Sequence, residues 1–148
     1  DMGSEGLLLF TNDSQLGNRL TSPENHIDKV YHVKIDRLLS DAELEKLGTS
    51  IDLDGELSLD SEWKTLRHGE KTSWLEVRLR EGKNRQIRRM LEELYVAVDR
   101  LIRVQIGPLE LGALKKGEVR ELTQDEVREL AVVAGAGARG GARGGARR

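Results

Sequence analysis

The sequence predicts an α+β domain with a mixed, largely antiparallel sheet and flanking helices. Segments with the two-residue alternation of strands are joined by short turns, which is typical of antiparallel pairing. Helical segments interrupt these strands along the whole chain, which favours α+β over all-β architecture. With 148 residues, 37% of them apolar, the chain has room for one compact core but little for two.

The first predicted elements are a short strand and a helix. Residues 7–10 form a continuous apolar run of strand length. Asn12 and Asp13 follow this run and favour the start of a helix, which we expect to end near residues 22–23.

Residues 29–36 predict a half-buried strand because their side chains alternate between two faces. Val30 and His32 are expected on the outer face. The inner face is expected to carry Tyr31, Val33 and Ile35.

The middle of the chain predicts a helix and then antiparallel strands. Ser40 and Glu43 form a capping-box pattern, so a helix is expected from there to Gly48. Asp54 and Gly55 separate two alternating segments and predict a hairpin turn. Two further strands are expected at residues 62–66 and 73–80, around a turn at 68–69.

A basic helix is predicted to begin near Asn84. Its apolar residues recur with helical spacing, so one face can pack on a core while the arginines project elsewhere. The apolar residues of that face are Ile87, Met90, Leu91 and Leu94. Residues 96–106 predict another strand, which ends at 107–108. Thr123 begins a second capping box, and its helix is expected to end near Val133.

The C-terminal residues 135–148 contain only Gly, Ala and Arg. Such a composition cannot bury apolar area, so we expect a flexible tail after a domain that spans residues 1–134. The arginines of the tail favour either nonspecific RNA affinity or simple solubility.

The net charge of −2 hides a strong asymmetry. Residues 40–62 hold eight acids and one lysine, whereas residues 78–89 hold six cations and one acid. A phosphate polymer would be attracted to the second segment, since binding depends on local cation density. The alternative is that both segments are solvated faces.

Several function classes are excluded or disfavoured by composition. The absence of cysteine excludes disulfides, thiolate metal sites and cysteine nucleophiles, and it favours a cytoplasmic location. No apolar run approaches the length of about 18 residues that a membrane span needs. Three dispersed histidines give no metal-ligand spacing, so we expect no metal site.

Four blocks of the sequence, in the same order, resemble the ribosomal small-subunit pseudouridine synthase A family. Asp1 and the Gly-Leu-Leu-Leu that follows resemble the family's catalytic aspartate motif, and residues 29–31 resemble its Lys-x-Tyr strand. Residues 81–91 resemble its Glu-Gly-Arg-Asn-Arg-Gln-x-Arg-Arg-Met segment, and the match continues through residues 100–109 and 117–123. The chain departs from the family at Ser14, usually Gly, and at Tyr95 and Val96, usually Gly-His.

The resemblance implies an enzyme that isomerises uridine to pseudouridine in ribosomal RNA without a cofactor. It implies that Asp1 acts as nucleophile or as base, that Arg88 pairs with it, and that Tyr31 packs against a flipped-out uracil. Substrate binding is then expected to involve Lys83, Arg85, Arg89 and Leu101, the leucine in the apolar wall and the cations on phosphates.

Each of these residues also has a simpler interpretation. A terminal acid such as Asp1 is commonly frayed, a strand Tyr31 is commonly a core aromatic, and Arg88 alone is commonly a surface ion-pair partner. Trp63 and Trp74 are candidates for stacking on RNA or for core and cross-strand packing.

The family pattern places Gly-Arg-Leu before the catalytic aspartate, whereas this sequence starts at Asp1. We therefore expect a catalytic domain that is incomplete at its N-terminus, and a noncatalytic RNA-binding fragment is the alternative. The expected partner is ribosomal RNA or a ribosome assembly intermediate, with the protein acting as a monomer. The sequence leaves open which uridine and which subunit's RNA are modified.

Overall fold

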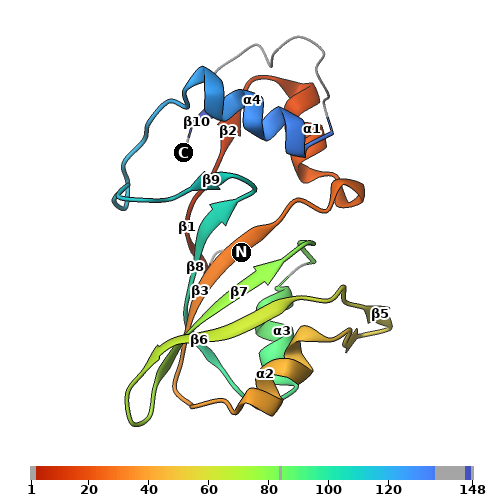
Figure 1. The fold of residues 1–148 in the computed structure, drawn as a ribbon, viewed down its shortest axis with the longest axis vertical. Helices are drawn as coiled ribbons and strands as arrows, with labels where there is room; N and C mark the ends of the chain where they lie inside the picture. Colours follow the sequence, from red (N-terminus) through yellow and green to blue (C-terminus); the bar gives the residue numbers. More distant parts are fainter. Residues whose placement is uncertain (1–2, 84, 136–145, 148) are drawn as a thin grey trace.

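The computed structural model describes residues 3–83, 85–135 and 146–147 (Figure 1). The described residues form a six-stranded sheet in the order β1-β8-β3-β7-β6, with β9 paired to β8. β1 runs parallel to β8 and the other pairs are antiparallel, so the predicted mixed, largely antiparallel α+β fold is confirmed. The strands are β1 (Glu5–Gly6), β3 (Lys29–Ile35), β6 (Glu62–His68), β7 (Ser73–Leu79), β8 (Val98–Ile106) and β9 (Leu109–Glu110).

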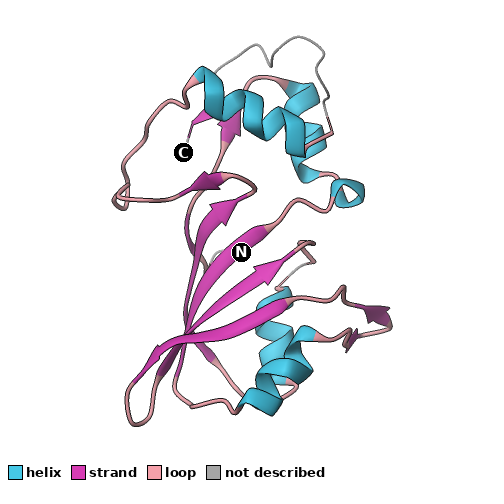
Figure 2. Ribbon diagram, in the orientation of Figure 1, coloured by secondary structure: helices cyan, strands magenta, loops and turns pink. Residues whose placement is uncertain are grey.

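Helices lie at both ends of this sheet (Figure 2). They are α1 (Ser14–Thr21), α2 (Asp41–Gly48), α3 (Gln86–Glu92), α4 (Gln124–Val133) and the short 3-10 helix η1 (Pro23–Asn25). Two small antiparallel pairs complete the described structure: β4 (Asp52–Leu53) with β5 (Glu56–Leu57), and β2 (Phe10–Thr11) with β10 (Ala146–Arg147).

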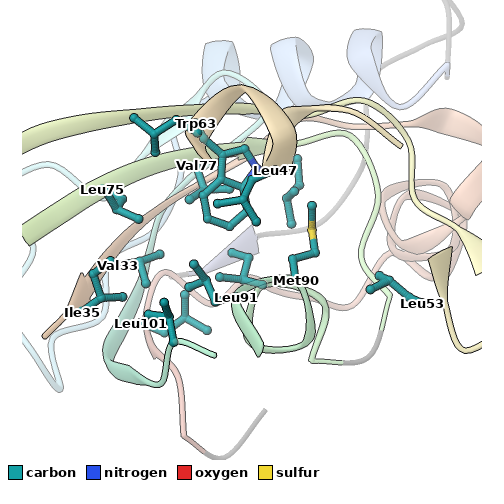
Figure 3. Packing of buried hydrophobic residues seen from close by; sticks show 14 residues of the cluster. Val33, Ile35, Leu47, Leu53, Trp63, Leu75, Val77, Met90, Leu91 and Leu101 are labelled. Carbon is teal, nitrogen blue, oxygen red and sulfur yellow. The ribbon is translucent and has the colours of Figure 1, made fainter. Parts of the chain in front are cut away.

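The larger of two core clusters joins one face of the sheet to α2 and α3. Leu47 of α2 and Leu91 of α3 are buried with Val33, Leu75 and Val77 of the strands (Figure 3). Because strand side chains alternate, every second residue of β7 faces this cluster, which fixes the sheet against the basic helix.

The second cluster joins the other end of the sheet to α1 and α4. Leu7, Leu16, Ile106, Leu109 and Leu130 are among its buried residues. Leu7 precedes the first helix and Leu130 belongs to the last, so this cluster brings the two ends of the described domain together.

The two predicted capping boxes and the predicted hairpin are confirmed. Ser40 and Thr123 each form a complete capping box, with Glu43 and Glu126 respectively. Arg120 also donates to both Glu126 oxygens and lowers the pKa of that carboxyl to about 2. The β4–β5 turn lies at the predicted site, where the carboxylate of Asp52 accepts from a turn N–H.

The prediction of a strand at residues 7–10 was wrong. Leu7 to Leu9 lie between β1 and β2, because Leu7 and Leu9 pack in the second cluster while the Leu7 N–H donates to the Arg103 carbonyl. Val30 is buried although the alternation placed it outside, and the β3–β8 pairing shifts register between Val30 and Tyr31.

Three boundaries also differ from the prediction. β6 continues to His68, β8 begins at Val98, and α3 begins at Gln86 because Arg85 adopts a left-handed conformation with φ of 52°. Of the predicted flexible tail, Ala146–Arg147 form β10, and residues 136–145 and 148 lie outside the described part of the chain.

We predict that Gly6→Ala destabilises the fold by about 1–3 kcal/mol. Gly6 has a φ of +103°, and a Cβ atom there would lie 2.3 Å from the Arg103 carbonyl oxygen. Urea unfolding measures the change, and Gly82→Ala is the matched control because its Cβ would meet nothing within 4 Å. Equal losses in the two variants would contradict the role assigned to Gly6.

Candidate active site

The N-terminal segment is held on β8. Gly6 pairs with Arg103 in the parallel β1–β8 ladder, and the Leu7 N–H donates to the Arg103 carbonyl at 2.8 Å. The Arg103 side chain adds two hydrogen bonds to the same segment, because its Nε and Nη2 donate to the Leu7 carbonyl at 2.9 and 2.7 Å. The segment that follows Asp1 in the sequence is therefore fixed to β8, with β1 as an edge strand of the sheet.

Arg88 brings the basic helix to this same segment. Its Nη2 donates to the Gly3 carbonyl at 3.0 Å, across 85 residues of sequence. Asp1, the predicted catalytic acid, lies outside the described residues, and Gly3 follows it by two positions. The guanidinium group that the sequence assigned to Asp1 thus contacts the backbone two residues after Asp1.

Tyr31 and Leu101 lie on the face of the sheet that α3 covers. Leu101 is 5% exposed and belongs to the larger core cluster, and Tyr31 is half-buried and packs against that cluster. Tyr31 is also the cross-strand partner of Arg103, the residue that holds Leu7. Tyr31 and Leu101 therefore lie on the sheet face that packs against α3, the helix that carries Arg88.

Two charged side chains near these residues have altered proton affinity. Burial, followed by the positive charge of Arg103, lowers the pKa of Lys29 below its ordinary value. Arg100 donates to both oxygens of Glu5 and holds the pKa of that carboxyl below its ordinary value. Glu5 and Arg100 thereby add an ion pair to the junction of β1 and β8.

The turn that precedes α3 is braced by a buried amide. Gln86 is 3% exposed; its Nε2 donates to Glu81 at 2.8 Å, and its Oε1 accepts from the Lys83 N–H at 3.1 Å. The same Glu81 oxygen accepts from the Leu59 N–H at 3.0 Å. This network fixes the turn from which Arg85 begins the helix.

Two other residues that we predicted to contact the substrate, Lys83 and Arg89, pair with the β4–β5 hairpin instead of the segment after Asp1. The ammonium of Lys83 lies 3.1 Å from Glu56, and Arg89 lies 3.8 Å from Asp54, both acids of the β4–β5 hairpin. The acidic segment 40–62, which the sequence left without an explanation, thus supplies carboxylates to the basic segment. Arg85 is exposed at the N-cap of α3.

Sequence reasoning assigned no role to Arg103 or Gln86. Arg103 could not be found from local patterns because its partner is 96 residues away. Gln86 is a polar residue in a basic run, and its burial distinguishes it from the exposed Arg85 before it.

Residues 1–93 match the family model described as RNA pseudouridylate synthase. The chain belongs to the RNA pseudouridylate synthase family. The family match and the predicted blocks coincide at Asp1, residues 29–31 and residues 81–91.

Relatives of known name support this assignment to the pseudouridylate synthases. The chain is 37% identical over 139 residues to the ribosomal large subunit pseudouridine synthase B of Bacillus subtilis, covering 93% of this chain and 57% of that protein. It is 34% identical over 136 residues to the Haemophilus influenzae protein of the same name, covering 91% and 38%. An RNA pseudouridine synthase of Rickettsia typhi is 37% identical over 132 residues, covering 88% and 53%.

The fold agrees with a solved structure of a pseudouridylate synthase. The two superpose with a TM-score of 0.73 at 30% sequence identity, covering 80% of this chain and 51% of the other. The chain thus spans about half the length of the relatives that it matches. In the described part of the chain, no helix has the length and apolar character that crossing a bilayer requires.

We predict that Gln86→Leu destabilises the folded domain by about 1–3 kcal/mol, because it leaves Glu81 and the Lys83 N–H without their buried partner. Urea unfolding provides the measurement. Gln124→Leu, at an exposed glutamine in the first turn of α4, is the matched control. A loss no larger than that of the control would show that the amide does not brace the turn.

Proposed function

We propose that this chain forms the uridine-isomerising centre of a ribosomal RNA pseudouridine synthase. The observation that carries the proposal is the hydrogen bond from Arg88 to Gly3, which joins the basic helix to the segment that begins with Asp1. Its support comes from the family match and from the shared placement of Tyr31 and Leu101 on the sheet face that α3 covers.

In the proposed reaction Asp1 supplies the carboxylate, as nucleophile or as base and ion stabiliser. Arg88 beside it would hold that carboxylate ionised and oriented. The C1′–N1 bond of the uridine breaks, the base turns, and a C1′–C5 bond forms. C5 loses its proton and N1 gains one, so the isomerisation balances without a cofactor.

The remaining residues bind the substrate in this proposal. A stacked uridine cannot reach the carboxylate, so the base is flipped out at a cost of a few kcal/mol. Tyr31 would stack on the uracil, and Leu101 would form part of the apolar wall. Arg85 is exposed at the N-terminus of α3 and would contact a phosphate there. Lys83 and Arg89 would give up their contacts with the hairpin carboxylates and contact phosphates instead.

The substrate class follows from the names of the relatives. The Bacillus subtilis and Haemophilus influenzae proteins are named for the large ribosomal subunit, so its RNA is the first substrate to assay. We propose that the protein acts as a monomer in the cytoplasm, on ribosomal RNA or on an assembly intermediate.

We predict that Asp1→Asn abolishes pseudouridine formation and spares RNA binding, because the amide has neither the charge nor the nucleophilicity of the carboxylate. Mass spectrometry of large-subunit RNA fragments measures the product. The assay compares the 148-residue chain with a form lengthened upstream, since the relatives are about twice as long. Equal product from variant and parent would end the catalytic proposal, and salt-sensitive binding with no product from either form would favour a noncatalytic RNA-binding role.

We predict that Arg85→Ala/Arg89→Ala weakens RNA binding and reduces the slope of log K against log salt by about 1.4, as expected for two lost phosphate contacts on single-stranded RNA. Fluorescence anisotropy at several salt concentrations measures both quantities. The control is Arg19→Ala/Lys46→Ala, which removes the same charge from exposed helix positions. An unchanged slope would remove both arginines from the RNA interface.

A further inference from the structure

The face of the sheet opposite the larger core carries a different set of side chains. Val33 and Leu75 are fully buried against α2 and α3, and their sequence neighbours Lys34 and Trp74 therefore point to the opposite side. Lys34 and Trp74 are half-buried, and Arg67 and Arg100 on the adjoining strands are exposed. This side of the sheet is accessible to a partner.

Strand register places these four residues in one row. Arg67 of β6 pairs with Trp74 of β7, Trp74 pairs with Lys34 of β3, and Lys34 pairs with Arg100 of β8. Neighbouring strands are about 4.8 Å apart, so the row crosses about 14 Å of the sheet. We call these four residues the cationic row.

Trp74 orders the two arginines of the cationic row. The guanidinium carbon of Arg67 lies 5.0 Å from the centroid of the Trp74 ring, and that of Arg100 lies 5.7 Å away. A cation–π contact orients a guanidinium without neutralising its charge. The row thus presents two partly pre-organised arginines beside a lysine.

The positive charge of the cationic row is only partly compensated. Arg100 forms its ion pair with Glu5, whereas no carboxylate of the described residues lies within 4 Å of Lys34 or Arg67. In the next row the charges are balanced, because Glu76 lies 3.3 Å from Lys64 and 3.6 Å from His32. Attraction for an anion is therefore concentrated in the cationic row.

We propose that the cationic row binds the sugar–phosphate backbone of an RNA strand, on the side of the sheet away from Tyr31 and Arg88. This inference rests on the proposed function, since the anionic polymer that the protein meets is then RNA. Cations arranged around an aromatic residue are typical of surfaces that follow a single strand without sequence preference. A second copy of the chain fits less well, because a two-fold contact would set like charges against each other.

The test measures binding of a fluorescent oligouridine of about 20 nucleotides, which is longer than the roughly 4–16 nucleotides that a single-strand binding site covers. We expect Lys34→Gln/Arg67→Gln to weaken binding by about tenfold and to reduce the salt slope by about 1.4. Arg19→Gln/Lys46→Gln is the charge-matched control, and thermal unfolding verifies that each variant is folded. If the double variant unfolds early, Arg67→Gln alone replaces it, because Arg67 is exposed.

A second readout uses the two tryptophans. Trp63 is 9% exposed in the core, and its indole N–H donates to Ser61, so RNA should not reach it. RNA that contacts the cationic row should therefore quench the emission of Trp74 and leave that of Trp63 unchanged. Quenching should disappear in Trp74→Phe and persist in Trp63→Phe.

The outcomes separate this inference from the proposed function. If Arg85→Ala/Arg89→Ala weakens binding and the row variant behaves like its control, the cationic row is not an RNA surface while the proposed function stands. If neither variant differs from its control, both proposals lose their support. Self-association of the chain that the row variant abolishes would assign the surface to a second copy and overturn the inference.

Discussion

The contact between Arg103 and Leu7 holds the candidate site together. The backbone of Arg103 pairs with Gly6 and accepts from the Leu7 N–H, and its side chain donates twice to the Leu7 carbonyl. Residues 7–9 belong to no helix or strand, so their position depends on contacts of this kind. Here the contact fixes that segment on a central strand, within reach of Arg88, and the same Arg103 is the cross-strand partner of Tyr31.

The acidic hairpin explains how a strongly basic helix is stable in a folded domain. Asp54 and Glu56 lie beside Arg89 and Lys83, which reduces repulsion within the basic segment. The two acids are largely exposed, whereas the Arg89 and Lys83 side chains are 28% and 24% exposed, and ion pairs that are open to solvent contribute at most about 1 kcal/mol each. RNA phosphates can therefore replace these carboxylates at small cost, so the pairing is compatible with the proposed role of the two cations.

Local features were predictable from the sequence, and long-range ones were not. The caps at Ser40 and Thr123 and the turn at Asp54 depend on residues within a few positions, and the structure has them as predicted. The parallel β1–β8 pair depends on Arg103, far along the chain, so residues 7–10 were assigned to a strand of their own. Family resemblance selected the site residues, and only the structure shows which of them share a face.

Register couples the two faces of the sheet. β3 directs Tyr31 toward the core side and Lys34 to the opposite side, and β8 does the same with Leu101 and Arg100. The β3–β8 ladder shifts register just before Tyr31 and just after Lys34, so the pairs between these points remain in phase. A slip of β3 by one residue would exchange the faces of Tyr31 and Lys34 together, because side chains alternate along a strand. The same β3–β8 pairing that sets Tyr31 opposite Arg103 therefore also sets Lys34 opposite Arg100 in the cationic row.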